Sequence, residues 1–246
     1  MKKACIIGLI CASLFFLFYF GLPQFNNPSW KQYPVRGVDV SSYQGDIDWD
    51  VLSKQGIHFA FIKATEGSSF VDKNFSVNFA NANKTNLRIG AYHFFSFDSA
   101  GETQAENFIS QVPKLDGALP PVVDFEFYGD KAGNHPDYDD TRKELNALLD
   151  LLERHYETKP IIYVSEKTYK LYLAGHYETY DIWIRNILTK PKPLENQPWV
   201  FWQYSNRKHL EGYKGTEYYI DMNVFNGTVE EFYNYATAQP HNPGVQ

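Results

Sequence analysis

Two acidic residues, Asp124 and Glu126, stand two positions apart in an otherwise apolar stretch from Pro120 to Phe127. The stretch predicts a buried strand, in which side chains alternate between faces and each residue advances about 3.3 Å. Both carboxyl groups should therefore point the same way, with their Cα atoms about 6.6 Å apart. Crowding two acids in a partly desolvated place raises the pKa of one, which leaves a proton donor beside an anion near neutral pH.

A proton donor beside an anion is the arrangement that hydrolysis of a glycosidic bond requires. The alternative is a structural acid pair at a strand end, satisfied by arginine or by backbone N–H groups. For an isolated Asp-x-Glu the structural role is the commoner one, so the surrounding elements have to decide between the two.

Length and composition indicate how many domains the chain can form and which classes of partner suit it. The 246 residues suffice for one sizeable core, which predicts a single catalytic domain, and we expect a monomer. The formal net charge is −6 and no basic stripe is present, so we expect no nucleic-acid partner. Aromatic residues make up 17% of the chain and suit a carbohydrate groove, although most of them must pack in the core.

The N-terminus predicts export. Lys2 and Lys3 precede an uncharged apolar run from Ala4 to Leu22, close to the length of about 20 residues that spans a bilayer. The run is longer than the core of a usual signal peptide, and no small-x-small cleavage pattern follows it. We therefore expect residues 1–22 to be a transmembrane anchor, or else a signal segment, with the remainder of the chain outside the cytoplasm.

Three further segments are expected. Residues 23–34, rich in Pro, Asn and Gln, predict a short linker, residues 35–236 the catalytic domain and residues 237–246 a disordered tail. Both cysteines, Cys5 and Cys11, precede the linker, so metal sites built on cysteine are excluded from the domain. We expect neither a metal nor a cofactor.

Within the domain, apolar runs alternate with helical patterns, which predicts repeated βα units. Five strands are expected at Val35–Val40, Phe59–Thr65, Arg88–Phe95, Val122–Phe127 and Pro160–Ser165. Five helices are expected at Trp49–Gln55, Asn74–Lys84, Thr103–Val112, Thr141–Tyr156 and Lys167–Ala174. In the fourth helix, Thr141 and Glu144 fit a capping box.

Later strands are expected at Asp181–Arg185, Trp199–Tyr204 and Tyr219–Phe225, without helical connections. The fold class is therefore α/β, an irregular TIM-like barrel of five βα units followed by three strands. Chemistry in such barrels lies at the carboxyl ends of the strands. Asp39 in the first strand and Asp221 in the last could therefore converge with Asp124 and Glu126 on one mouth.

At this point the chain resembles glycoside hydrolase family 25, the Chalaropsis-type lysozymes or N-acetylmuramidases. The resemblance covers Arg36 to Phe232 and rests on seven motifs in family order. They are Arg36–Ser41 with Gln44, Phe61–Gly67, Gly90–Phe94, Asp124–Glu126, Pro160–Tyr163, Trp202–Tyr204 and Ile220–Asn223.

The resemblance implies hydrolysis of the β-1,4 bond between N-acetylmuramic acid and N-acetylglucosamine in the glycan strands of peptidoglycan. Glu126 then matches the general acid and Asp124 its partner, which orients the substrate's 2-acetamido group as the nucleophile of a retaining reaction. Asp39 and Asp221 match the remaining acids of the family site, which tune the donor's pKa and hold the substrate.

Five residues near strand ends are candidates for substrate binding: Lys63, Tyr92, Tyr163, Trp202 and Gln203. For Tyr163 and Trp202, stacking on a sugar ring and packing in the core have about equal weight. Lys63 could instead pair with a neighbouring acid, and His93 is expected to be a hydrogen-bonded structural histidine.

Two alternative functions remain open at this stage. One is another N-acetylhexosaminidase on the same scaffold, acting on a chitin-like polymer, because acetamido assistance needs only the 2-acetamido group. The other is a catalytically silent cell-wall-binding protein, against which the presence of all four acids argues.

Overall fold

The computed structural model describes residues 26–236 except residues 193, 195 and 196. The expected anchor or signal segment, residues 1–22, and the expected disordered tail, residues 237–246, lie outside the described residues. Within the part of the chain that is described, no helix combines the length and the apolar character needed to cross a membrane.

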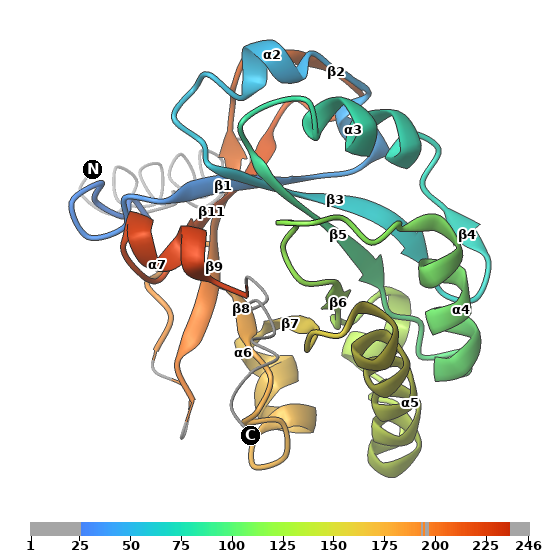
Figure 1. Cartoon of the computed structure of the whole chain (residues 1–246). Helices are drawn as coiled ribbons and strands as arrows, with labels where there is room; N and C mark the ends of the chain where they lie inside the picture. Colours follow the sequence, from blue (N-terminus) through green and yellow to red (C-terminus); the bar gives the residue numbers. More distant parts are fainter. Residues whose placement is uncertain (1–25, 193, 195–196, 237–246) are drawn as a thin grey trace, which may run out of the picture.

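The described residues form a closed barrel of eight strands (Figure 1). The strands are β1 (Arg36–Val40), β3 (Phe59–Glu66), β5 (Arg88–Phe94), β6 (Val122–Asp124), β7 (Ile161–Ser165), β8 (Ile182–Arg185), β9 (Trp199–Lys208) and β11 (Ile220–Phe225). Around the barrel they follow the order β1-β11-β9-β8-β7-β6-β5-β3, and β3 pairs with β1 to close it. β11 is antiparallel to both of its neighbours, β1 and β9, whereas β3 to β9 pair in parallel.

Helices lie on the outside of the first five strands, as Figure 1 shows for α3 to α5. The helical elements are α2 (Trp49–Leu52), α3 (Phe75–Ala82), α4 (Gly101–Gln111), α5 (Tyr138–Tyr156), α6 (Glu166–Thr168) continued by the π-type turn η3 (Tyr169–Leu173), and α7 (Val229–Asn234). Short elements at the loops are η1 (Ser42–Gln44), β2 (Asp46–Ile47), β4 (Phe70–Val71), η2 (Gly129–Ala132) and β10 (Tyr213–Lys214). The predicted α/β barrel of five βα units followed by three strands is confirmed.

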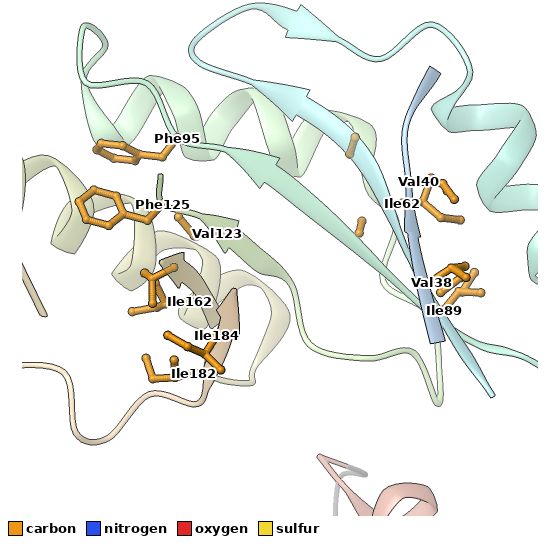
Figure 2. Packing of buried hydrophobic residues seen from close by; sticks show 14 of the residues in the cluster. Val38, Val40, Ile62, Ile89, Phe95, Val123, Phe125, Ile162, Ile182 and Ile184 are labelled. Carbon is orange, nitrogen blue, oxygen red and sulfur yellow. The ribbon is translucent and has the colours of Figure 1, made fainter. Parts of the chain in front are cut away.

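Strand alternation divides the apolar side chains into two cores. Outward-facing residues such as Val38, Val123 and Ile162 pack between the barrel and its helices (Figure 2). Inward-facing aromatic and aliphatic residues fill the barrel itself: Phe59, Phe61, Val122, Ile161, Trp183, Phe201 and Phe225. The same alternation turns Asp124, two residues after Val122, toward the barrel axis.

Two local expectations are wrong. The capping box of Thr141 and Glu144 does not form, because α5 begins at Tyr138 and Asp137 caps it by accepting hydrogen bonds from the N–H groups of Asp139 and Asp140. The strand expected to reach Phe127 ends at Asp124, so Glu126 lies just beyond the sheet.

Part of the segment expected to be a linker lies against the barrel. Asn26 is buried, and its side-chain amide donates to the carbonyl oxygens of Asn186 at 2.8 Å and Tyr204 at 3.2 Å. The Tyr33 ring packs against Trp199 and Trp202, with ring centroids 6.0 and 5.9 Å away. Residues 26–34 therefore belong to the folded body.

Candidate active site

Four acids from three strands and the loop after β6 line one pocket of about 190 Å³ at the carboxyl end of the barrel. Asp39 comes from β1, Asp221 from β11 and Asp124 from the last position of β6, while Glu126 follows β6. Asp39 and Asp221 lie directly opposite each other in the register of β1 and β11. The convergence that the sequence predicted is present in the structure.

Side-chain amides hold Asp39 and Asp221 together. The Gln203 Nε2 group donates to both Asp39 oxygens, at 3.2 and 3.0 Å, and to Asp221 Oδ2 at 3.2 Å. Asn223 Nδ2 donates to Asp39 Oδ2 at 2.7 Å. Two acids that would repel each other when ionised are therefore bridged by neutral donors.

Aromatic residues fix the orientation of these amides. The Tyr163 hydroxyl donates to Gln203 Oε1 at 2.9 Å, and Trp183 Nε1 donates to Asn223 Oδ1 at 2.9 Å. The Tyr163 and Trp183 rings meet edge to face with centroids 4.6 Å apart. Because each amide oxygen already accepts from an aromatic donor, each amide nitrogen is left to face the acids.

Burial raises the pKa of the Asp124 carboxyl well above its usual range, and the neighbouring Glu126 charge adds to the rise. Burial also raises the pKa of Glu126, against the attraction of the Arg185 guanidinium. The sequence led us to expect a raised pKa for one acid of the pair, whereas the pKa of both carboxyls is raised, that of Asp124 more strongly. The buried Asp124 Oδ1 atom has no hydrogen-bond partner among the described residues.

Asp221 is the second strongly perturbed acid. Burial, followed by the Asp39 charge, raises the pKa of Asp221 to about 9. Burial also raises the pKa of Asp39, but the hydrogen bonds that it accepts from Asn223 and Gln203 oppose the rise. The hydrogen bonds from Asn223 and Gln203 therefore favour the ionised form on Asp39 rather than on Asp221.

Two cationic side chains, Lys63 and Arg185, lie near the site but form no ion pair with Asp124 or Glu126 among the described residues. Lys63 lines the pocket, and its ammonium forms an ion pair with Glu66 at 2.8 Å and lies 4.9 Å from the Phe94 ring centroid. Arg185 attracts the acids through space but makes no ion pair within 4.0 Å to any described residue. Asp124 and Glu126 are thus not the arginine-satisfied structural pair that the sequence left open.

Of the five residues predicted to bind substrate, Lys63, Tyr92, Tyr163 and Gln203 line the pocket. Trp202 does not, and its predicted sugar contact needs correction. Gln203 faces the barrel axis, so alternation turns Trp202 outward, where it is 2% exposed and donates from Nε1 to the Asn186 carbonyl at 2.8 Å.

Sequence reasoning missed two participants. Asn223 shares a strand face with Asp221, and Arg185 shares one with Trp183, so parity within each strand could have indicated both. His93 is buried between Thr65 Oγ1 at 2.7 Å and Gln104 Oε1 at 3.1 Å, which agrees with a structural histidine. Its pKa is lowered to about 4 by burial.

Comparison with known proteins identifies the family. The sequence model described as Glycosyl hydrolases family 25 matches residues 38–213, and the chain belongs to this family. A solved family 25 glycosyl hydrolase from Bacillus anthracis is 56% identical, covers 87% of this chain and 99% of its own, and superposes with a TM-score of 0.81.

Two curated relatives span most of the chain. Protein YegX of Escherichia coli is 36% identical over 204 residues, which are 81% of this chain and 72% of that protein. Lysozyme M1 of Streptomyces globisporus is 30% identical over 207 residues, which are 79% of this chain and 68% of that protein. The resemblance read from the sequence motifs is confirmed, and the chain is a glycoside hydrolase of the lysozyme class.

Proposed function

We propose that this protein is an exported lysozyme that hydrolyses the β-1,4 bond between N-acetylmuramic acid and N-acetylglucosamine in peptidoglycan. The observation that carries the proposal is the convergence of Asp39, Asp124, Glu126 and Asp221 on one pocket at the mouth of a family 25 barrel. The relative named lysozyme M1 supports the same substrate class.

In the proposed reaction Glu126 is the general acid. Burial raises its pKa, which favours the protonated carboxyl that gives its proton to the leaving glycosidic oxygen as the bond to C1 breaks. The oxygen of the substrate's own 2-acetamido group attacks C1 and forms a ring. Glu126, now ionised, then takes a proton from the water that attacks C1, which reopens the ring and retains the anomeric configuration.

Asp124 is proposed to orient the acetamido group. Its buried Oδ1 atom has no hydrogen-bond partner in the described part of the chain, and an amide N–H is the donor that would satisfy it. Such a hydrogen bond favours the ionised form of Asp124, which would place the shared proton on Glu126 when substrate is bound. The two acids follow each other on one strand end and need not straddle the sugar, which suits this substrate-assisted route.

Reducing-end analysis of digested cell wall tests the bond specificity. We expect new N-acetylmuramic acid ends to accumulate with time. New N-acetylglucosamine ends would point to another hexosaminidase, and an unchanged wall would point to a silent binding protein. The β-configured product expected of retention can be followed by NMR during the first turnovers.

We further propose that the N-terminal apolar run anchors the domain to the outer face of the cytoplasmic membrane. The support is the length of the run after Lys2 and Lys3, together with a wall substrate that lies outside the cytoplasm. The intact mass of the protein in the membrane fraction tests it: a full-length mass supports an anchor, and a soluble protein lacking residues 1–22 contradicts it.

A further inference from the structure

Three exposed tyrosines border the pocket on the side of β1 and β11. Tyr43, Tyr218 and Tyr219 are 60%, 67% and 45% exposed, and we name this set the aromatic rim. Tyr43 lines the pocket itself, as does Glu217, the residue before Tyr218. The rim is therefore a continuation of the active site.

The exposed Tyr218 ring of the rim packs against two other aromatic rings. The Tyr218 ring stacks on His209 with centroids 4.6 Å apart and planes 26° apart, and Tyr219 meets its edge at 5.1 Å. The Tyr213 hydroxyl donates to the Tyr218 carbonyl at 2.8 Å. One face of Tyr218 is covered in this way, and the side chain remains largely exposed.

Backbone contacts join the two segments of the rim. The Tyr43 carbonyl accepts from the Glu217 N–H at 3.1 Å, and Gln44 Nε2 donates to the Tyr219 carbonyl at 3.4 Å. Gly215 makes this approach possible, because a Cβ atom there would lie 1.9 Å from the Tyr43 carbonyl oxygen. The close approach fixes Tyr43 beside the loop that carries Tyr218 and Tyr219.

A buried acid also holds the turn that carries Tyr43. Asp72 is 3% exposed and accepts from the Ser42 N–H at 2.8 Å and the Asn74 N–H at 2.9 Å. Ser41 and Gln44 complete a capping box within the turn. A surface whose backbone is held by such hydrogen bonds loses little conformational freedom when a ligand binds to it.

The pocket alone is small for a polymeric substrate. Its volume of about 190 Å³ lies below the range of about 300–1,000 Å³ typical of pockets that enclose a drug-sized ligand. A glycan strand must therefore continue over the surface, and the C–H faces of sugar rings match the flat faces of tyrosines.

We propose that the aromatic rim is a second binding site of this enzyme, on which sugar rings of the glycan strand outside the pocket stack. The proposal rests on a glycan being the substrate, as proposed above, but not on which glycosidic bond is cut. The rim's function is to increase affinity for long strands over short ones, without contact with the reacting atoms.

Binding measured against chain length tests the proposal. In the Glu126→Gln background, which prevents turnover, the Kd is measured by calorimetry for two-sugar and eight-sugar peptidoglycan strands. The two rim tyrosines that do not line the pocket are then truncated together by Tyr218→Ala and Tyr219→Ala. Tyr233→Ala is the matched control, because Tyr233 is also 45% exposed but lies on α7. The Phe232 carbonyl of α7 accepts from Arg88 at the start of β5, which is the opposite end of the barrel.

We expect the double substitution to weaken binding of the eight-sugar strand about three- to tenfold, as loss of aromatic stacking predicts, with the two-sugar Kd unchanged. Tyr218→Phe with Tyr219→Phe should bind like the parent. An unchanged eight-sugar Kd would overturn the proposal, and so would an equal loss for both lengths, since that would mean an altered pocket. Repeating the series with chitin oligomers keeps the rim's test separate from the bond specificity, which reducing-end analysis decides.

Discussion

At the scale of single residues, the site depends on the side-chain amides of Gln203 and Asn223 as well as on the acids, because these amides donate hydrogen bonds to Asp39 and Asp221. Gln203 was predicted to bind substrate, yet its donors face Asp39 and Asp221 and its oxygen accepts from Tyr163. We interpret Gln203 as a positioning residue that keeps the carboxyl groups of Asp39 and Asp221 close together.

Replacing Gln203 with methionine tests this role. The change leaves buried polar partners unsatisfied, which should cost about 1–3 kcal/mol of unfolding free energy and also shift the pH profile of kcat/KM. Gln197→Met is the control: Gln197 is similarly buried but donates to the backbone carbonyls of Tyr177 and Tyr180. It should lose comparable stability and keep the parent pH profile, and identical profiles for both variants would argue against the positioning role.

Asp221 predicts a pH dependence of stability. Its folded pKa of about 9 exceeds its ordinary value of 3.8, so the folded state binds the proton more tightly than the unfolded chain does. The stabilisation is full below about pH 4 and is lost as pH rises toward about 9. Asp221→Asn mimics the protonated form, so its Tm should fall less than that of the parent between pH 5 and pH 8.

The exposed Asp150 supplies the control for that measurement. Asp150→Asn should leave the pH dependence of Tm as in the parent protein. If Asp221→Asn and the parent lose Tm in parallel between pH 5 and pH 8, Asp221 is not held protonated in the folded state.

At the scale of elements, β9 shows how alternation assigns roles. Phe201 and Gln203 face the barrel axis, and Trp202 faces Tyr33 and Trp199 on the outside. Trp202→Ala should therefore lower the unfolding free energy by about 3–5 kcal/mol, the usual cost of truncating a buried tryptophan. Enzyme that remains folded should keep the parent KM for cell wall, and a raised KM with an unchanged Tm would restore the sugar-binding role.

The packing of α4 against α5 depends on Gly101. A Cβ atom at this position would lie 2.0 Å from the Glu144 carbonyl oxygen, and the Gly101 N–H donates to Glu144 Oε2 at 2.7 Å. Gly101→Ala should destabilise the fold by about 1–3 kcal/mol through overpacking. Gly133→Ala is the control, because its Cβ atom would meet nothing closer than 3.7 Å. Equal urea midpoints for the two variants would contradict this account of the helix pair.

At the scale of the whole molecule, periodicity predicted most of the barrel. Apolar runs separated by helical patterns indicated the first five strands, and apolar runs without helical connections indicated the last three. Helix starts were less well predicted, because Asp137 and Thr141 both suit a cap and only packing decides between them.

The alternation of side chains along each strand predicted which acids meet at the site, but not the hydrogen bonds between strands. Parity and strand ends brought Asp39, Asp124, Glu126 and Asp221 together, whereas the hydrogen bonds of Gln203 depend on neighbours from β1, β7 and β11. Such contacts arise only once the barrel closes. The pKa difference between the acids likewise follows from burial, which local sequence does not fix.

The most direct test of the central claim, that Glu126 supplies the proton, is the clearing rate of a cell-wall suspension by Glu126→Gln. The amide keeps the shape of the side chain but has no proton to give, so the rate should fall about 10²–10⁴-fold while wall binding persists. An unchanged rate of clearing, with wall binding and Tm equal to those of the parent, would contradict the account.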